Sequence, residues 1–548
     1  MSSGQVEGGN VTVVLGEAVA EAADVAIASL VAEGVPARLA AKDASLWGPD
    51  AAEEAAVRLG WVDLARSSRA LLPELGRQVD AKRAAGLDRV VLAGMGGSSL
   101  APEVIAATAG KPLVTLDTTD PAQVRRALGT DLDRTVLVVS SKSGGTVETD
   151  SQRRAFEAAL EEAGLDPAAH IVVVTDPGSP LAATAAEKGY PTFLADPEVG
   201  GRYSALTAFG LVPSALAGVD VEALLDQAEA LSATLASEPT GNPALALGAA
   251  LGGFTGHDKV VLAGSAPAGL GDWIEQLVAE STGKNGTGLL PVVVEDAAAP
   301  GFAPEADTHL VAFGETGPPD APLADTTVWG PLGGQFLAWE FATAIAGRLL
   351  GIDPFDQPNV QESKDNTKAL LEKSGDGPLP VDTPLLVDGP VEVHAGAAAD
   401  SAAGLAGAAD LDAVLRTLLR AVPEDGYLAL LCYLDRGEDT VAAGLRPALA
   451  ALTPRPVTFG WGPRFLHSTG QYHKGGPANG VFLQVTGDNP ADLAIPGRPY
   501  TFARLQLAQA LGDFGALAER DRPVVRLHLR DRAAGLERVA QALGRVSP

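Results

Sequence analysis

Two loops rich in glycine and hydroxyl side chains carry the most recognisable chemistry in the sequence. Residues 94–99 read Gly-Met-Gly-Gly-Ser-Ser and follow the largely apolar run 89–93. Residues 141–146 read Ser-Lys-Ser-Gly-Gly-Thr and follow a similar run at 135–139. A strand that leads through such a turn into a helix presents backbone N–H groups, hydroxyl groups and the positive end of the helix dipole to an anion. We therefore predict that the two loops bind a phosphate group.

The same loops do not fit the nucleotide-binding motifs. The first loop lacks the lysine followed by serine or threonine of a P-loop, and its glycines lack the dinucleotide-binding spacing, so neither ATP nor NAD is expected. Both loops could instead be tight turns between strand and helix, and this alternative stays open. The residues expected to contact phosphate are Gly97, Ser98, Ser141, Lys142, Ser143 and Thr146.

Unbroken β-branched runs alternate with helical patterns through most of the chain and decide the expected fold class. Between 88 and about 215 the order is strand, helix, strand, helix, and the alternation returns at about 240–375 and after 376. Apolar runs without polar alternation are typical of parallel strands that are covered on both faces. The sequence therefore predicts an α/β protein with two doubly wound parallel-sheet domains and a C-terminal α/β segment.

We expect four regions in the 548 residues, a length that allows three or four domain-sized units. Residues 12–85 are alanine-rich with helical periodicity, so we expect residues 1–85 to form a helical lead-in. Residues 86–220 contain both loops and should form the first α/β domain, and residues 221–375 should form the second. Residues 376–548 should form the C-terminal α/β segment, in which the role of 376–460 stays open.

The composition indicates a globular protein that binds neither nucleic acid nor a membrane. Charged residues make up 20% of the chain, with a formal net charge of −29 at pH 7, so local arginine and lysine side chains must hold any anionic ligand. The single cysteine, Cys432, lies in an apolar run and is expected to be a buried structural thiol. The sequence has neither the pattern of a signal peptide nor a stretch that could span a bilayer, so we expect a soluble cytoplasmic protein.

Three further phrases, in order along the chain, make the sequence similar to one enzyme family. They are Val-Gly-Gly-Arg-Tyr-Ser at 199–204, Ala-Glu-Ser-Thr-Gly-Lys at 279–284, and Phe-Asp-Gln at 355–357, with Lys364 seven residues after Gln357. The two loops resemble those of the sugar-isomerase (SIS) domain, a doubly wound sheet that holds the phosphate of a phosphosugar. Together, the five motifs resemble the phosphoglucose isomerase family over about residues 88–370, which implies two SIS-type domains.

Isomerisation of a phosphosugar moves a carbonyl group between C1 and C2, and these phrases contain suitable residues. The reaction needs a base that carries a proton between the two carbons and a cation beside the enediolate oxygen. Glu280 suits the base, and Arg202 suits the cation because a guanidinium stays charged at any working pH. The resemblance assigns Lys364 to ring opening and Gln357 to support of the sugar. It implies interconversion of glucose 6-phosphate and fructose 6-phosphate through a cis-enediol, a step of glycolysis and gluconeogenesis, and we expect neither a cofactor nor a metal ion.

The histidine that the family uses for ring opening is out of place in this chain. The family has it between the glutamate and the Phe-Asp-Gln motif, where this chain offers only His309, in an unrelated context. A matching phrase, Phe-Leu-His-Ser-Thr-Gly-Gln, occurs much later, at 465–471. We therefore interpret this segment as relocated and favour His467 over His309. In the family this histidine reaches the site from a neighbouring subunit, so the resemblance also implies a homodimer.

Two other functions remain open from the sequence. A dual phosphoglucose and phosphomannose isomerase would use the same base, because the sequence does not reveal which side chains surround C2. A phosphosugar-binding regulator would need only the two loops, but it would leave the arginine, the glutamate and the later glutamine and lysine without a role.

Overall fold

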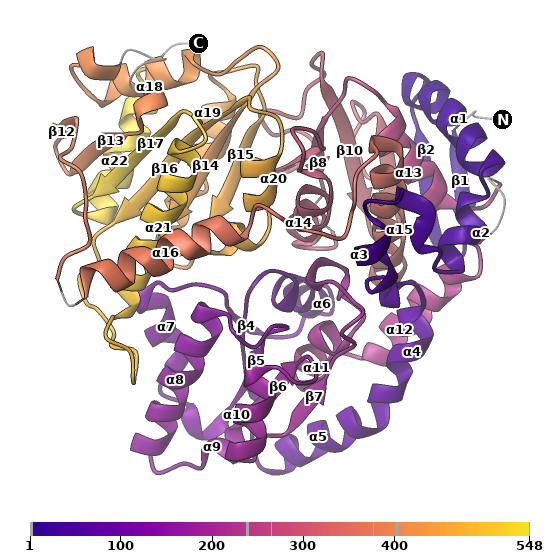
Figure 1. Cartoon of the computed structure of the whole chain (residues 1–548), viewed down its shortest axis with the longest axis horizontal. Coiled ribbons are helices and arrows are strands. Elements are labelled where there is room, and N and C mark those ends of the chain that lie inside the picture. The colour runs from indigo at the N-terminus through magenta and orange to yellow at the C-terminus, as the bar shows by residue number, and fades with distance from the viewer. Residues whose placement is uncertain (1–3, 237–239, 265, 376, 400–404, 547–548) are drawn as a thin grey trace.

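The computed structural model describes residues 4–236, 240–264, 266–375, 377–399 and 405–546. Three sheets, each with a parallel centre, lie in this part of the chain, and helices cover their faces (Figure 1). This arrangement confirms the predicted α/β fold class. Within the same residues, no helix combines the length and the apolar character that a membrane span requires.

The first sheet carries both glycine-hydroxyl loops. Its strands are all parallel and pair in the order β4-β3-β5-β6-β7. They are β3 (Arg89–Gly94), β4 (Val114–Leu116), β5 (Thr135–Ser140), β6 (Ile171–Thr175) and β7 (Thr192–Leu194). The helices of this unit are α6 (Leu100–Thr108), α7 (Pro121–Leu128), α8 (Val147–Glu162), α9 (Pro167–His170), α10 (Pro180–Lys188) and α11 (Ala208–Leu216). Because β3 and β5 are neighbours, the loops that follow them leave the sheet at the same edge.

The second sheet contains two strands from the N-terminal region. Its order is β1-β2-β11-β10-β8-β9, parallel from β11 to β9 and antiparallel at the β1-β2-β11 edge. The strands are β1 (Gln5–Gly8), β2 (Val11–Leu15), β8 (Lys259–Ala263), β9 (Leu290–Val294), β10 (Thr308–Gly314) and β11 (Thr326–Trp329). The helices of this unit are α12 (Val221–Ser232), α13 (Pro243–Gly253), α14 (Leu270–Thr282) and α15 (Leu332–Leu350).

The prediction of a helical lead-in is therefore wrong for residues 5–15. Gly9 turns the chain with a φ of 59°, a left-handed conformation that glycine adopts without strain, and β2 then pairs with β11. The β-branched valines of β2 favour a strand once such a partner is available. The remaining helices of the region are α1 (Glu17–Ala32), α2 (Val35–Ala40), α3 (Ala52–Ala56), α4 (Leu64–Ser67) and α5 (Leu72–Ala84).

The third sheet is formed by the C-terminal segment. Its order is β12-β13-β17-β16-β14-β15, with parallel pairing from β17 to β15 and antiparallel pairing of β12 and β13 at one edge. The strands are β12 (Leu386–Asp388), β13 (Val391–Ala395), β14 (Tyr427–Tyr433), β15 (Val457–Trp461), β16 (Gly480–Gly487) and β17 (Val524–Leu529). The helices are α18 (Leu411–Arg420), α19 (Leu445–Ala450), α20 (Gly470–Gly475), α21 (Phe502–Ala518) and α22 (Arg532–Leu543).

The third unit packs closely on the other two. One apolar cluster joins the second and third sheets and includes Val261 and Leu290 together with Leu431 and Phe482. Another contains strands of the first sheet and residues of α21 and the segment before it. Because these clusters cross between units, the C-terminal segment shares its hydrophobic core with the rest of the molecule.

One helix near the expected boundary at 375 packs on the third unit. α16 (Gln361–Ser374) lies along α21, as Figure 1 shows. Gly512 permits this approach, because a Cβ atom there would lie 2.6 Å from Thr367 Oγ1. Lys364 is therefore carried by a helix that the third unit supports.

Candidate active site

The first glycine-hydroxyl loop packs against the turn that carries the candidate arginine. The loop forms η4 (Gly96–Ser98) and the arginine lies in η6 (Gly201–Tyr203). A Cβ atom on Gly97 would lie 1.8 Å from the carbonyl oxygen of Gly201, so only glycine fits at this contact. Ser98 is almost completely buried here.

In the second loop, several polar side chains already have partners. Ser141 Oγ lies 3.0 Å from Thr146 Oγ1, and Lys142 Nζ lies 2.5 Å from a carboxylate oxygen of Asp176. The ammonium group of Lys142 is thus engaged by a carboxylate. The two hydroxyl groups remain at the start of α8, where the helix dipole favours an anion.

A cavity of about 790 Å³ lies beside the second loop. Residues 143–148 line one side of it, and Lys364 and His467 line it from α16 and from the third unit. The cavity therefore brings together one glycine-hydroxyl loop and two of the residues that the sequence assigned to catalysis. The first loop and the pair formed by Arg202 and Glu280 are outside its lining.

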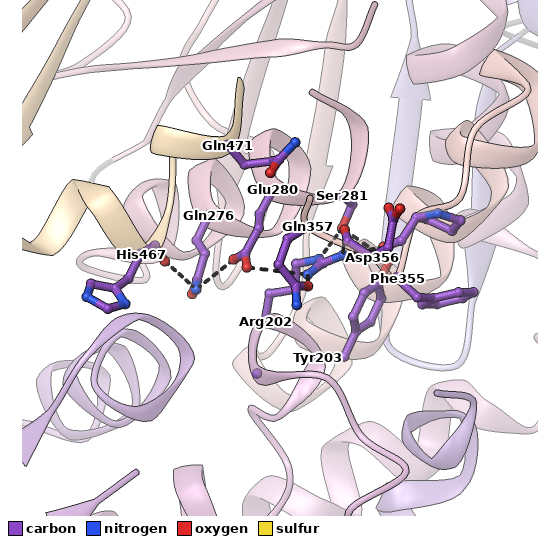
Figure 2. A network of polar contacts seen from close by, with 12 residues as sticks. Arg202, Tyr203, Gln276, Glu280, Ser281, Phe355, Asp356, Gln357, His467 and Gln471 are labelled. Atoms are coloured by element: carbon purple, nitrogen blue, oxygen red, sulfur yellow. Dashed lines mark hydrogen bonds and ion pairs between the residues drawn. The ribbon is translucent and has the colours of Figure 1, made fainter. Parts of the chain in front are cut away.

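Arg202 and Glu280 lie next to each other. Nη1 of Arg202 is 3.4 Å from Oε1 of Glu280, which lies near the end of α14. The guanidinium also donates to Ser281 Oγ at 2.8 Å, to Gln357 Oε1 at 2.8 Å and to the carbonyl oxygen of Pro354 at 2.7 Å (Figure 2). Arg202 is only 2% exposed, so its orientation is fixed by these contacts. Residues of the two later motifs, at 279–284 and 355–357, thus converge on the guanidinium of Arg202.

Lys284 anchors the segment that carries Gln357. Its Nζ donates to the carbonyl oxygens of Asp353 and Asp356, at 2.6 and 2.7 Å, and pairs with the Asp356 carboxylate. Burial and the charge of Arg202 lower the pKa of Lys284 to about 8. The sequence motif contains Lys284, but nothing in the motif alone indicated this supporting contact.

Gln276 connects the candidate base to the histidine segment. Its Nε2 donates to Glu280 Oε2 at 3.1 Å and to the backbone carbonyl oxygen of His467 at 2.8 Å, as the dashed lines in Figure 2 show. We did not identify Gln276 from the sequence. Its spacing of four residues from Glu280 was the available signal, because such residues share one face of a helix.

The imidazole of His467 lies against a carboxylate of the same chain. His467 ends η9 (Arg464–His467), and its Nε2 is 3.0 Å from Oε1 of Glu148, in the first turn of α8. Gln509 donates to the same oxygen at 2.7 Å. Burial raises the pKa of Glu148 and the charge of His467 lowers it, with a net decrease. Glu148 was missed because an acidic residue at the start of a helix is common for reasons of helix stability alone.

His309 has a different environment. It is fully buried in β10, its Nε2 is 2.8 Å from Thr326 Oγ1, and its ring meets Phe254 edge-on. Burial lowers its pKa to about 3, so its ring is neutral at physiological pH. These contacts are those of a structural histidine within the second sheet.

Comparison with known proteins confirms the resemblance to the phosphoglucose isomerase family. Residues 77–287 match the family model described as phosphoglucose isomerase. This range includes both glycine-hydroxyl loops, Arg202 and Glu280, whereas Gln357, Lys364 and His467 lie beyond it.

Curated relatives of this chain include proteins named glucose-6-phosphate isomerase or probable glucose-6-phosphate isomerase. The probable enzyme of Haloarcula marismortui is 39% identical over 215 residues, which cover 38% of this chain and 49% of that protein. The protein of Geobacter sp. (strain M21) is 40% identical over 210 residues, which cover 36% and 40%. The chain thus spans half the length or less of these two relatives. The glucose-6-phosphate isomerase of Rubrobacter xylanophilus is 29% identical over 375 residues, which cover 54% of this chain and 84% of that protein.

Two solved structures share much of the fold. A hypothetical protein of Thermus thermophilus has a TM-score of 0.56 and 25% identity, covering 66% of this chain and 99% of that chain. A glucose-6-phosphate isomerase from Chlamydia trachomatis has a TM-score of 0.53 and 18% identity, covering 67% and 90%. The second likeness shows the fold alone.

Proposed function

We propose, from the premise that residues 77–287 form a phosphoglucose isomerase-family domain, that this protein is an aldose-ketose isomerase. The proposed reaction interconverts glucose 6-phosphate and fructose 6-phosphate, the activity that the names of the curated relatives indicate. The observation that carries the proposal is the contact between Arg202 and Glu280, because it joins a carboxylate base to a permanent positive charge. The substrate class is a small phosphosugar.

The phosphate group of the substrate would bind at the two loops. Ser141, Ser143 and Thr146 supply hydroxyl groups, and backbone N–H groups of both loops supply further donors. Lys142 adds positive charge even while it is paired with Asp176. This arrangement would hold the phosphate end of the sugar beside the cavity that Lys364 and His467 line.

Ring opening precedes the movement of the carbonyl group, because the substrate is cyclic in solution. We assign this step to His467 and Lys364, which line the same cavity. Glu148 holds Nε2 of His467, so Nδ1 is the nitrogen left to exchange a proton with the sugar ring oxygen. The positive charge of Lys364 favours the negative charge that develops on the opened ring.

Proton transfer would then occur between C1 and C2. Glu280 takes the proton from C2 of the open aldose, the C1 carbonyl oxygen gains negative charge, and Arg202 stabilises the resulting cis-enediolate. Glu280 then returns the carbon-bound proton to C1, and the proton of the hydroxyl group on C2 passes to the oxygen on C1. The carbonyl group is then on C2, and Gln357, bound to Arg202, keeps the guanidinium in place.

A coupled assay with purified variants tests this assignment. Glu280→Gln keeps the shape of the side chain but removes the base, so we expect kcat to fall by about 10²- to 10⁴-fold, with phosphosugar binding largely retained. His467→Ala should also lose activity, and His309→Ala should keep it. Near-normal turnover by Glu280→Gln, or a loss confined to His309→Ala, would contradict the proposal. Mannose 6-phosphate in the same assay identifies a dual isomerase.

A cytoplasmic location and a homodimer belong to this proposal as well. Both follow from the resemblance and from the soluble character expected of the sequence. We also propose that His467 serves the site of its own chain, and its contact with Glu148 within that chain supports this.

A further inference from the structure

A group of charges around the buried Arg464 joins all three units. Arg464, from the third unit, is 9% exposed. Its Nη1 lies 2.8 Å from Oε2 of Glu103 on α6 and 3.1 Å from Oδ2 of Asp117, which follows β4. Its Nη2 lies 3.7 Å from Oδ2 of Asp272 on α14. One guanidinium therefore contacts carboxylates of the first and the second unit.

Arg464 and His467 occupy the two ends of one short turn. They begin and end η9, and residues three apart in a 3₁₀ helix lie above one another on the same face. The imidazole must be held opposite Glu148 of the first unit, although its turn belongs to the third unit. A fixed point at the other end of the turn would limit how far the ring can move.

The ionic contacts of Arg464 are strong enough for such a role. Burial raises the pKa of Glu103, but the charges of Arg464 and Arg436 lower it to about 2, so the carboxylate is ionised at working pH. A buried guanidinium between two carboxylates is held firmly, because a buried charge is costly without its partner.

The neighbouring Arg436 provides an internal comparison. Its Nη2 lies 2.7 Å from Oε1 of Glu103, and its Nη1 lies 3.9 Å from Oδ1 of Asp117. It follows β14 and lies outside the turn that carries His467. The two arginines thus share their carboxylates but differ in their connection to the histidine.

We propose that Arg464 is a positioning residue for His467: by binding Glu103 and Asp117 it fixes η9 on the first unit and keeps the imidazole opposite Glu148. This inference rests on the proposed isomerase function for its kinetic consequence. The position of the His467 ring, which the inference also concerns, can be measured without substrate.

The test compares Arg464→Met with Arg436→Met in the full-length protein. We expect Arg464→Met to lower kcat by about 10- to 100-fold, since a small displacement of a catalytic group has an effect of this size, while KM for fructose 6-phosphate changes by less than about threefold. Arg436→Met should keep kcat within about threefold of the wild-type value. Arg464→Lys retains a charge without the guanidinium fork and should give an intermediate kcat; it also serves if the methionine variant does not fold.

Histidine-selective NMR reads the position of the ring directly. The His467 resonance is assigned by its absence in His467→Ala, and we expect it to move in the Arg464 variants but not in Arg436→Met. An unmoved resonance with kcat near wild type in both Arg464 variants, or equal losses in the Arg464 and Arg436 variants, would overturn the inference. If the wild-type protein has no isomerase activity, the proposed function fails, and the NMR comparison still decides whether Arg464 positions the ring.

Discussion

At the scale of single residues, Arg202 is the most constrained member of the candidate site. It is bound by a serine hydroxyl, a glutamine side chain and backbone carbonyl oxygens, and it is almost completely buried. Its position is therefore set before any ligand arrives, which is the arrangement that favours stabilisation of developing charge. The carboxylate of Glu280 is held from the opposite side by Gln276 (Figure 2).

Replacement of Gln276 tests this second support. Gln276→Leu keeps the size of the side chain but removes the donor to Glu280 and to the His467 carbonyl oxygen. A hydrogen bond to a charged group contributes about 1.5 to 3 kcal/mol, so we expect kcat to fall by about 10-fold or more, with a smaller change in KM. Steady-state kinetics with fructose 6-phosphate measure both constants. A kcat within twofold of wild type would show that Glu280 does not depend on this contact.

At the scale of elements, α14 is the common support of the candidate site. Gln276 at its middle and Glu280 near its C-terminal end lie one turn apart, and Ser281 follows Glu280 directly and binds Arg202. The helix packs on β9 and α15 of the second unit and on α6 and α20 of the other units. The position of the proposed base therefore depends on the packing of α14 against all three units.

The N-terminal hairpin is an element whose contribution to stability can be isolated. Val13 is fully buried in β2 between β1 and β11, whereas Val25 on α1 is 75% exposed. We expect Val13→Ala to lower the free energy of unfolding by about 2 kcal/mol, because it removes buried apolar surface. Val25→Ala, the matched control, should change it by less than about 0.5 kcal/mol. Urea unfolding compares the two, and equal effects would contradict the assignment of residues 5–15 to the core of the second sheet.

At the scale of the whole molecule, the third unit contributes to the candidate site of the same polypeptide. It supplies His467 from η9 and supports Lys364 through the packing of α16 on α21. It is joined to the other units by shared apolar clusters and by the ion pairs of the buried Arg464. The relocated histidine segment thus approaches Glu148 from the same chain.

Mixing two inactive variants tests whether the site is complete in one chain. His467→Ala and Glu280→Gln each remove one proposed catalytic residue. If each site uses residues of one chain only, a mixture of the two variants should be as inactive as each variant alone, even after the two are refolded together. We expect this result. A site shared between subunits would instead regain activity in the mixed dimer, because one of its two sites would then be intact. Wild-type protein refolded in parallel controls for recovery.

Much of the local structure was predictable because it depends on short-range pattern. The parallel strands that precede both loops and the phrases around Arg202 and Glu280 could be identified from composition, spacing and resemblance. The residues that support the site could not. Glu148 and Gln276 lie on helices, where acidic and amide side chains are common for reasons unrelated to catalysis. Only their contacts with His467 and Glu280 in the folded chain identify them as supports of the candidate site.

The sequence by itself determined the α/β class and the glycine-hydroxyl loops, and it favoured His467 over His309 as the candidate histidine, since each depends on residue type and order along the chain. Only the tertiary structure decided that residues 5–15 form strands, that α16 packs on the third unit, and that His467 meets Glu148 of its own chain. The physical reason is that these outcomes depend on contacts between segments more than 100 residues apart. Whether such a segment forms a strand, which face of a helix is buried and which ion pair forms all depend on the segment that packs against it.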